Sequence, residues 1–361
     1  MDIFAIQLKS IVKLHKKLYN LIKRFLLEGK LMSELENEEV NKLVNKILSD
    51  YGRGRAIDKM ALFNQPDVEK IKQITNKLIR LVFPGYYRDQ VYKSYNLAGN
   101  LTVLIEDVLY NLSKQIEIVL CYDEICSRQE NGEDGSLSSS EEAKFKDQAY
   151  CLALTFCNRI PEIREYVQTD LEATFQGDPA ASSFDDIILS YPGLRATTIN
   201  RLAHALFQLN VPLIPRMMTE YAHSVTGIDI HPGARIGKYF CLDHGTGVVV
   251  GSTTIIGDHV KVYQGVTIGA LSTAAGQALH GVKRHPTIED NVTIYSGASI
   301  LGGQTIIGKG SVIGSNAFIT KSVPAGTRVT IKNQELVLKD RNGMIIEKND
   351  LDQSEAWFYV I

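Results

Sequence analysis

Two short polar segments with acid–base side chains interrupt a stretch that is otherwise aliphatic and rich in glycine. They read IDIHPG at 228–233 and LDHGTG at 242–247. An imidazole titrates near neutral pH, so His244 can take a proton from a hydroxyl group as that hydroxyl attacks an acyl carbon. Asp229 lies about one turn of the repeat earlier and can hold the tautomer of His244 and stabilise its imidazolium. The pair favours acyl transfer, and the alternative is a surface histidine beside a solvated aspartate.

A third polar segment, KRHP at 283–286, follows an insertion into the same stretch. The Arg284 guanidinium can clamp a carboxylate with two hydrogen bonds, whereas Asp243 or Asp178 can bind an ammonium group. Together these groups would select an amino acid, although each alone is an ordinary surface charge. The chain contains no HExxH segment or other strong metal-binding signature. We therefore predict that no metal takes part.

These polar segments are set in a repeat with a period of six residues. Aliphatic residues recur at Ile230, Ile236, Leu242 and Val248, then, after a two-residue offset, at Ile256, Val262 and Ile268, and after the insertion at Ile288, Ile294, Ile300, Ile307, Ile313 and Ile319. A small or β-branched residue follows most of them four positions later. A six-residue unit is a short strand plus a turn, and three units close one triangular coil. The spacing predicts a parallel β-helix, and it lacks the period-two alternation of a sandwich.

The residues before the repeat have a helical period, with few glycines or prolines inside each segment. The run at 127–140 is polar and has one apolar residue, so it reads as a mobile loop. We therefore predict an α+β protein with an α-helical domain over 1–222, a parallel β-helix domain of hexapeptide repeats over 223–330, and a carboxyl-terminal tail over 331–361.

Composition narrows the class of protein. Of the 361 residues 44% are apolar and 22% are charged, and the formal net charge of −2 suggests no nucleic-acid partner. Five cysteines without a Cys-x-x-Cys pair predict neither a disulfide framework nor a zinc site and favour the cytoplasm. Cys241, although next to the LDHGTG segment, reads as a small buried residue and not as a nucleophile. Lysines interrupt the first 30 residues too often for a membrane span, and a packed amphipathic helix over 11–25 is preferred to a membrane-surface helix.

The polar segments together resemble one known family. The matching text runs from about Asp170 to Lys321 and includes DLEATFQGDPA, YPGLRA, RLAHAL, GIDIHPGARIG, LDHGTGVVVG, VYQGVTIGA, KRHPTIEDNV and GASILGG. Hexad repeats alone indicate the hexapeptide-repeat acyltransferase superfamily. The combination of DIHPGA, LDHGTG, GVTIG and RHP resembles the serine O-acetyltransferases within it.

The resemblance implies that the domain over 223–330 is a left-handed parallel β-helix acyltransferase domain, and that the protein forms a trimer or a dimer of trimers. It also implies direct acetyl transfer from acetyl-CoA to the hydroxyl of L-serine, the first step of cysteine biosynthesis. By resemblance His244 matches the family's base and Asp229 its partner carboxylate. The residues that match the serine-binding positions are Asp178, Asp243, Arg284 and His285. The weaker matches, for acetyl-CoA, are Gly269, Ala270, Ser296 and Ser315.

Other interpretations stay open at this point. The insertion ALSTAAGQALHGVK (270–283) is longer than the family's usual link, so the acceptor or CoA side of the pocket could differ from the family's. The nearest alternative function is acetyl transfer to another hydroxyl or an amine, such as homoserine or a sugar. A different class is a silent scaffold that binds cysteine synthase. The resemblance suggests that the tail ending in Ile361 docks that enzyme, whereas Trp357 and Phe358 could instead fold back on the coil.

Overall fold

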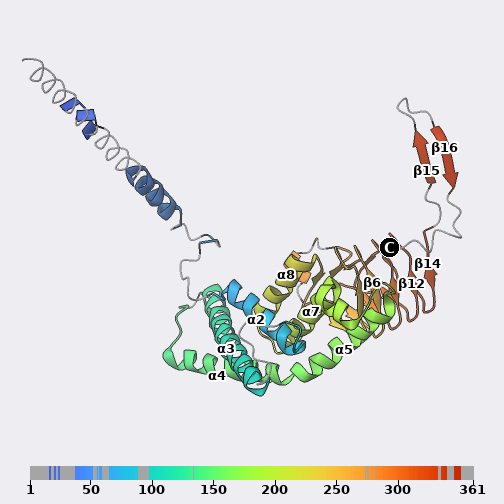
Figure 1. Ribbon diagram of the computed structural model, residues 1–361, viewed down its shortest axis with the longest axis horizontal. Coiled ribbons are helices and arrows are strands. Elements are labelled where there is room, and N and C mark those ends of the chain that lie inside the picture. The colour runs from blue at the N-terminus through green and yellow to red at the C-terminus, as the bar shows by residue number, and fades with distance from the viewer. Residues whose placement is uncertain are drawn as a thin grey trace, which may run out of the picture. The chain divides into compact units, whose positions relative to one another are not determined.

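The computed structural model describes residues 65–87, 97–132 and 134–331 except 273, 275 and 280, together with parts of 16–58 and the backbone of two strands near the carboxyl end (Figure 1). The chain forms two compact units, Met1–Leu62 and Phe63–Ile361. Most of the helix expected over 11–25 lies outside the described residues. Among the described helices, none combines the length and the apolar character that crossing a membrane requires.

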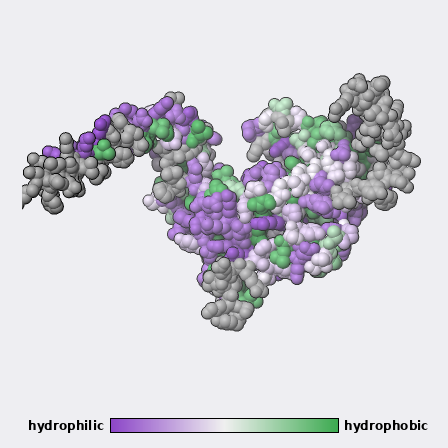
Figure 2. Space-filling model, turned by 45° about the horizontal axis from the view of Figure 1, so that its top comes forward, coloured by the Kyte–Doolittle hydropathy of each residue, from purple (hydrophilic) through white to green (hydrophobic). Residues whose placement is uncertain are grey.

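Helices make up the first part of the second unit. They are α2 (Val68–Val82), α3 (Leu97–Glu130), α4 (Ser139–Asn158), α5 (Ile160–Gly177), α6 (Phe184–Ser190), α7 (Pro192–Gln208) and α8 (Ile214–Thr226). Their apolar faces meet in one core that includes Leu78, Leu112, Phe156 and Leu202, all fully buried. The outer surface is mixed, since Figure 2 shows apolar residues scattered among hydrophilic ones.

The connection between α3 and α4 is shorter than the loop expected over 127–140, because α3 continues to Glu130 and α4 begins at Ser139. Ser138 forms a capping box with Glu141 at the start of α4. Arg128 on α3 pairs with Glu141 and donates to the carbonyl oxygen of Ser136. These polar contacts join the end of α3 to the start of α4. The mobility of this connection stays a prediction.

After α8 the chain winds into a parallel β-helix of very short strands. They are β1 (Asp229–Ile230), β2 (Arg235–Ile236), β3 (Cys241–Asp243), β4 (Val249–Val250), β5 (Ile255–Ile256), β6 (Lys261–Tyr263), β7 (Thr267–Gly269), β8 (Thr287–Ile288), β9 (Thr293–Ile294), β10 (Ser299–Leu301), β11 (Ile306–Ile307), β12 (Val312–Ile313), β13 (Phe318–Ile319) and β14 (Arg328–Val329). Each strand up to β13 pairs in parallel with the third strand before or after it, and β14 pairs with β12. This gives three faces: the β1 face (β1-β4-β7-β10-β13), the β2 face (β2-β5-β8-β11) and the β3 face (β3-β6-β9-β12-β14). The expected helical region followed by a parallel coil is confirmed.

The repeat aliphatics fill the coil interior, and all but Ile236 are buried. One assignment was wrong. Ile230 of β1 pairs with Val250 of β4, so Val250 and not Val248 is the strand aliphatic of that face. Val248 is a buried residue of the preceding corner. The two-residue offset therefore lies before β4, inside the corner that carries His244.

The helices and the coil share contacts across the expected boundary at residue 222, which falls inside α8. Helices α5 and α7 contact β3, and α8 contacts β1. Arg201 of α7 forms a buried two-pronged ion pair with Asp170 of α5, at 2.6 and 2.7 Å, and donates to the carbonyl oxygen of Gly237. Gly193 lets α7 approach β3, since a Cβ there would lie 2.3 Å from the carbonyl oxygen of Leu242. These contacts fix the ends of α5 and α7 beside the LDHGTG segment.

The last described elements form a separate antiparallel pair, β15 (Glu335–Lys339) with β16 (Ile345–Asp350). Residues 351–361 lie outside the described residues. The prediction that the end of the chain docks cysteine synthase therefore stays a prediction.

Candidate active site

His244 occupies a corner of the coil that is two residues longer than its counterparts. In successive coils the regular corner position is held by Gly247, Gly265, Gly297 and Asn316, all with positive φ. His244 (φ 57°) and Gly245 (φ 76°) add two further positive-φ residues to the first of these corners. For a non-glycine residue that conformation is uncommon and often marks a functional position. The extra residues push His244 outward, and 59% of its side chain is exposed.

Two carboxylates, Asp178 and Asp243, lie beside His244. Asp243 places Oδ1 3.8 Å from the Nε2 atom of His244. Asp178 caps the end of α5, where Oδ1 accepts a 2.8 Å hydrogen bond from the backbone N–H of Ala180. The hydroxyl of Tyr191 donates to Asp178 and is the main cause that lowers the pKa of this carboxyl below its usual value. The same hydrogen bond raises the pKa of Tyr191 to about 12.

Sequence reasoning missed two residues of this cluster. Tyr191 begins the YPGLRA segment, which was noted only as part of the resemblance. Lys261 occupies an outward position of the repeat, where its Nζ atom lies 2.9 Å from Oδ2 of Asp243. Periodicity assigns Lys261 to the coil surface but does not show that a helix end covers it. Asp178, Tyr191, Asp243, His244 and Lys261 are called the His244 cluster below.

The KRHP residues lie at a different edge of the coil, after β4 and before β8. Arg284 donates to Oγ of Ser252 at 2.9 Å and to the carbonyl oxygen of Leu279 at 3.0 Å. Thr253 Oγ1 accepts from the backbone N–H groups of Arg284 and His285. Leu279 ends the 3-10 helix η1 (Gly276–Leu279) of the insertion. The insertion thus helps to orient the guanidinium.

His285 is buried at this edge and is held in one tautomer. The backbone N–H of Thr253 donates to Nδ1 at 3.1 Å, so the proton of the neutral ring is on Nε2. Burial, with the charges of Arg284 and Lys283, lowers the pKa of His285 to about 4. The ring occupies space that only glycine leaves open, because a Cβ on Gly251 would lie 2.0 Å from Cδ2 of His285. Arg284, His285, Ser252 and Thr253 are called the Arg284 cluster below.

The two clusters stand at opposite ends of strand β4. The His244 corner precedes Val249, whereas Ser252 and Thr253 follow Val250. Among the described residues no hydrogen bond or ion pair joins Arg284 or His285 to Asp178, Asp243 or His244. A single chain therefore does not bring all the expected acceptor-binding residues together.

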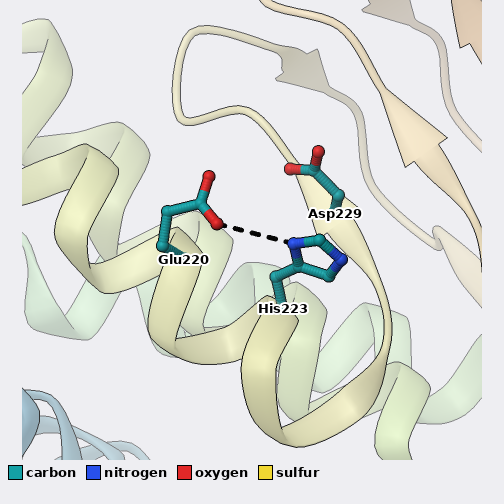
Figure 3. A group of neighbouring side chains, drawn as sticks. All are labelled: Glu220, His223 and Asp229. Carbon is teal, nitrogen blue, oxygen red and sulfur yellow. Dashed lines mark ion pairs between the residues drawn. The ribbon is translucent and has the colours of Figure 1, made fainter.

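Asp229 also differs from its expected setting. It lies on β1, and its described contact is an ion pair with Arg216 at 3.7 Å, not a hydrogen bond to His244. Figure 3 shows Asp229 with Glu220 and His223 of α8, and one donor atom from each of the three lies within 4.8 Å of the others. Arg216 pairs with both carboxylates, so a cation already balances this exposed group. The role of Asp229 as partner of His244 stays a prediction.

The residues expected to hold acetyl-CoA border the β1 face. Ser296 and Ser315 lie on corners of the same edge as His244, one above the other, with their hydroxyl oxygens 3.4 Å apart. Gly269 ends β7 and Ala270 follows it, on the edge that carries the Arg284 cluster. Side chains on this face are partly apolar, since Val249 is 38% and Phe318 is 71% exposed.

His231, His259 and Cys241 have structural settings. His231 accepts a hydrogen bond from the backbone N–H of Gly233, and burial is the main cause that lowers its pKa to about 4. His259 stacks on Tyr239 at 4.2 Å. Cys241 is 3% exposed and burial raises the pKa of its thiol to about 11, which disfavours a thiolate nucleophile. All five cysteines are free thiols.

Comparisons with known proteins agree with this architecture. The chain is 39% identical to a protein of Synechococcus elongatus called "Serine acetyltransferase, plasmid", over 83% of this chain and 89% of that one. It is 41% identical to a serine acetyltransferase of Helicobacter pylori, over 47% of this chain and 96% of that one. No family model matches the chain.

Two similar solved structures come from Entamoeba histolytica. Serine acetyltransferase isoform 3, in complex with cysteine, is 30% identical with a TM-score of 0.61, over 82% of this chain and 94% of that one. Serine acetyltransferase 1, in complex with L-cysteine, is 32% identical with a TM-score of 0.57, over 74% of this chain and 87% of that one.

Proposed function

The chain belongs to the serine acetyltransferase family of acyltransferases, and we propose that it transfers an acetyl group from acetyl-CoA to the hydroxyl of L-serine. The observation that carries this proposal is the His244 cluster, in which an exposed imidazole lies beside two carboxylates. His244 takes the hydroxyl proton as the serine oxygen attacks the thioester carbon. The carbon–sulfur bond then breaks and the CoA sulfur receives the proton. No covalent acyl-enzyme is required.

Asp178 and Asp243 are the groups that would bind the ammonium of the acceptor. Both carboxylates are anchored, Asp178 by Tyr191 and the backbone N–H of Ala180, and Asp243 by Lys261, so their positions are fixed before a ligand binds. Arg284 and His285 would bind the acceptor carboxylate. Because the clusters stand at opposite ends of β4, we propose that the His244 cluster of one copy meets the Arg284 cluster of another.

A threefold assembly of coils is the arrangement that supplies such a shared site. In a closed ring each copy offers one edge to one neighbour and its other edge to the next, so three equivalent sites form. The exposed apolar side chains of the β1 face, which lies between the two edges, support this proposal. Acetyl-CoA would lie along the same face, beside Gly269, Ala270, Ser296 and Ser315.

The proposed product is an acetylated serine whose acetate is a good leaving group, which suits the first step of cysteine biosynthesis. Cysteine has the ammonium and carboxylate of serine, and two similar structures contain it. We therefore expect cysteine to compete with L-serine for the two clusters. A rise in the serine KM with added cysteine, at constant kcat, would support this competition.

A thiol-release assay tests the function directly. Purified protein with acetyl-CoA and L-serine should release CoA and form O-acetylserine, whereas homoserine, a sugar and a simple amine should react much more slowly. Faster turnover with any of these acceptors would identify that acceptor, and not L-serine, as the substrate. No thiol release with any acceptor would leave the scaffold interpretation.

A further inference from the structure

Lys261 is a partly buried cation, with 19% of its side chain exposed, at the junction between the coil and the end of α5. It begins β6 and pairs in register with Cys241 of β3. Its Nζ atom lies 2.9 Å from Oδ2 of Asp243 and donates a 2.6 Å hydrogen bond to the carbonyl oxygen of Gly177. Gly177 is the last residue of α5 and directly precedes Asp178. One ammonium thus contacts Asp243 and the residue that positions Asp178.

The surroundings keep this ammonium charged. Burial lowers the pKa of Lys261, but hydrogen bonds to Tyr263 and Asp243 outweigh it and raise the pKa above its usual value. The ring of Tyr263 also lies close to the ammonium, with its centre 4.7 Å from Nζ. At neutral pH Lys261 therefore carries a positive charge, and its contacts with the end of α5 and with the coil favour that charged form.

The contact decides which oxygen of Asp243 is left for a ligand. Lys261 occupies Oδ2, whereas Oδ1 points toward the Nε2 atom of His244 at 3.8 Å. Tyr191 likewise orients Asp178 through a hydrogen bond. Two carboxylates and one ammonium leave the cluster with a single net negative charge. That charge matches an acceptor with one ammonium group, and removing Lys261 would leave two carboxylates that repel each other and lose their fixed spacing.

We propose that Lys261 is a positioning residue of the acceptor site, which holds Asp243 and the end of α5 at a fixed spacing and limits the site to one net negative charge. This inference rests on the proposed function, because it assumes that Asp178 and Asp243 bind the acceptor ammonium. The competing interpretation is structural: Lys261 only ties α5 to the coil. The two interpretations differ in what its loss does to each substrate.

The test compares Lys261→Met and Lys261→Arg with a matched control, Lys238→Met. Lys238 is an exposed lysine of the same coil, and its ammonium lies 5.4 Å from the ring centre of Tyr166. In Lys261→Met the serine KM should rise about tenfold or more, because Asp243 loses the charge-assisted hydrogen bond that positions it. The acetyl-CoA KM should change less than twofold. Lys261→Arg, which keeps the charge, should recover most of the serine affinity.

Calorimetric titration of each variant with L-serine gives the same comparison without turnover. A serine KM and Kd in Lys261→Met equal to those in Lys238→Met would overturn the inference. Equal losses for both substrates, together with a lowered unfolding midpoint, would show the structural role and also overturn it. If the wild-type protein releases no thiol with L-serine, the proposed function fails first, and that outcome is visible before any variant is compared.

A second variant moves the ammonium without removing it, in case Lys261→Met does not fold. A Cβ on Gly177 would lie 3.3 Å from Nζ of Lys261, which is tight enough to displace the ammonium by a few tenths of an ångström. Alanine also suits the end of a helix. Gly177→Ala should raise the serine KM by a few-fold with the acetyl-CoA KM unchanged. An unaltered serine KM in a folded Gly177→Ala protein would count against the inference.

Discussion

The hydroxyl of Tyr191 donates a 2.7 Å hydrogen bond to Oδ2 of Asp178 and joins the start of α7 to the end of α5 beside the coil. Tyr191→Phe should raise the serine KM by about fivefold, near the usual value of about 1 kcal/mol for one hydrogen bond. Tyr87→Phe is the matched control, because it removes a tyrosine hydrogen bond of 2.6 Å to the carbonyl oxygen of Ile188, within the helical core. Steady-state kinetics of both variants decide the matter: a larger effect on serine KM in Tyr87→Phe would contradict the prediction.

His244→Ala should lower kcat by on the order of 100-fold, the usual value of general-base help. The coil should stay folded because most of the His244 side chain is exposed. Circular dichroism and thiol release measure both effects. Activity within a few-fold of wild type would exclude His244 as the base.

Asp229→Asn tests whether that carboxylate acts through His244. If it does, the double variant with His244→Ala should be no slower than His244→Ala alone, since residues that act as a unit are not additive. Independent, multiplying losses would instead place Asp229 with Arg216, as its ion pair indicates. Rates of the two single variants and the double variant form the required cycle.

Mixed assemblies test whether the site is shared between copies. Arg284→Ala and His244→Ala should each be nearly inactive at low serine. After joint unfolding and refolding in equal amounts, about one site in four should combine an intact His244 with an intact Arg284, because each comes from the right copy half the time. Recovered activity near that fraction supports a shared site. A mixture no more active than its two components would show that each chain forms its site alone.

Gly251→Ala should displace the His285 ring, because the added Cβ would overlap Cδ2. We expect the free energy of unfolding to fall by about 2 kcal/mol, typical of overpacking. His285→Ala in the same chain removes the overlap and should recover part of that loss. Urea denaturation of the two single variants and the double variant measures the coupling, and strictly additive losses would show that the two side chains do not compete for space.

Acid should destabilise the fold through His231 and His285, whose pKa values are lowered to about 4. The unfolded chain takes up protons below about pH 6.5, where an ordinary histidine titrates, but the folded chain does not until about pH 4. Their contribution to stability is therefore complete above pH 6.5 and is lost as the pH falls toward 4. Urea denaturation between pH 7 and 4.5 should show this decline, and a shallower one in His285→Gln. Equal slopes in both proteins would exclude His285 as a cause.

Local order along the chain was readable from the sequence. The six-residue period identified the coil because every interior position must hold an aliphatic residue, whichever coil it belongs to. The helical period before it, and the grouping of Asp178, Asp243 and His244, followed from local patterns and from the family resemblance. The coil and the helices depend on residues that recur at fixed spacing, and Asp243 and His244 are neighbours in the chain, whereas Asp178 was grouped with them through the resemblance.

Only the tertiary structure decided how distant residues meet. The pairing of Ile230 with Val250 placed the two extra residues in the His244 corner, before β4. The spacing of the aliphatic residues alone had placed them after Val248. Lys261 reaches Asp243 and Gly177 because α5 folds back on β3, and no spacing encodes that contact. The coil also separates Arg284 from His244, because consecutive corners of a triangular coil lie at different edges. Side-chain period specifies which residues face inward, whereas packing between elements specifies which outward-facing residues become a site.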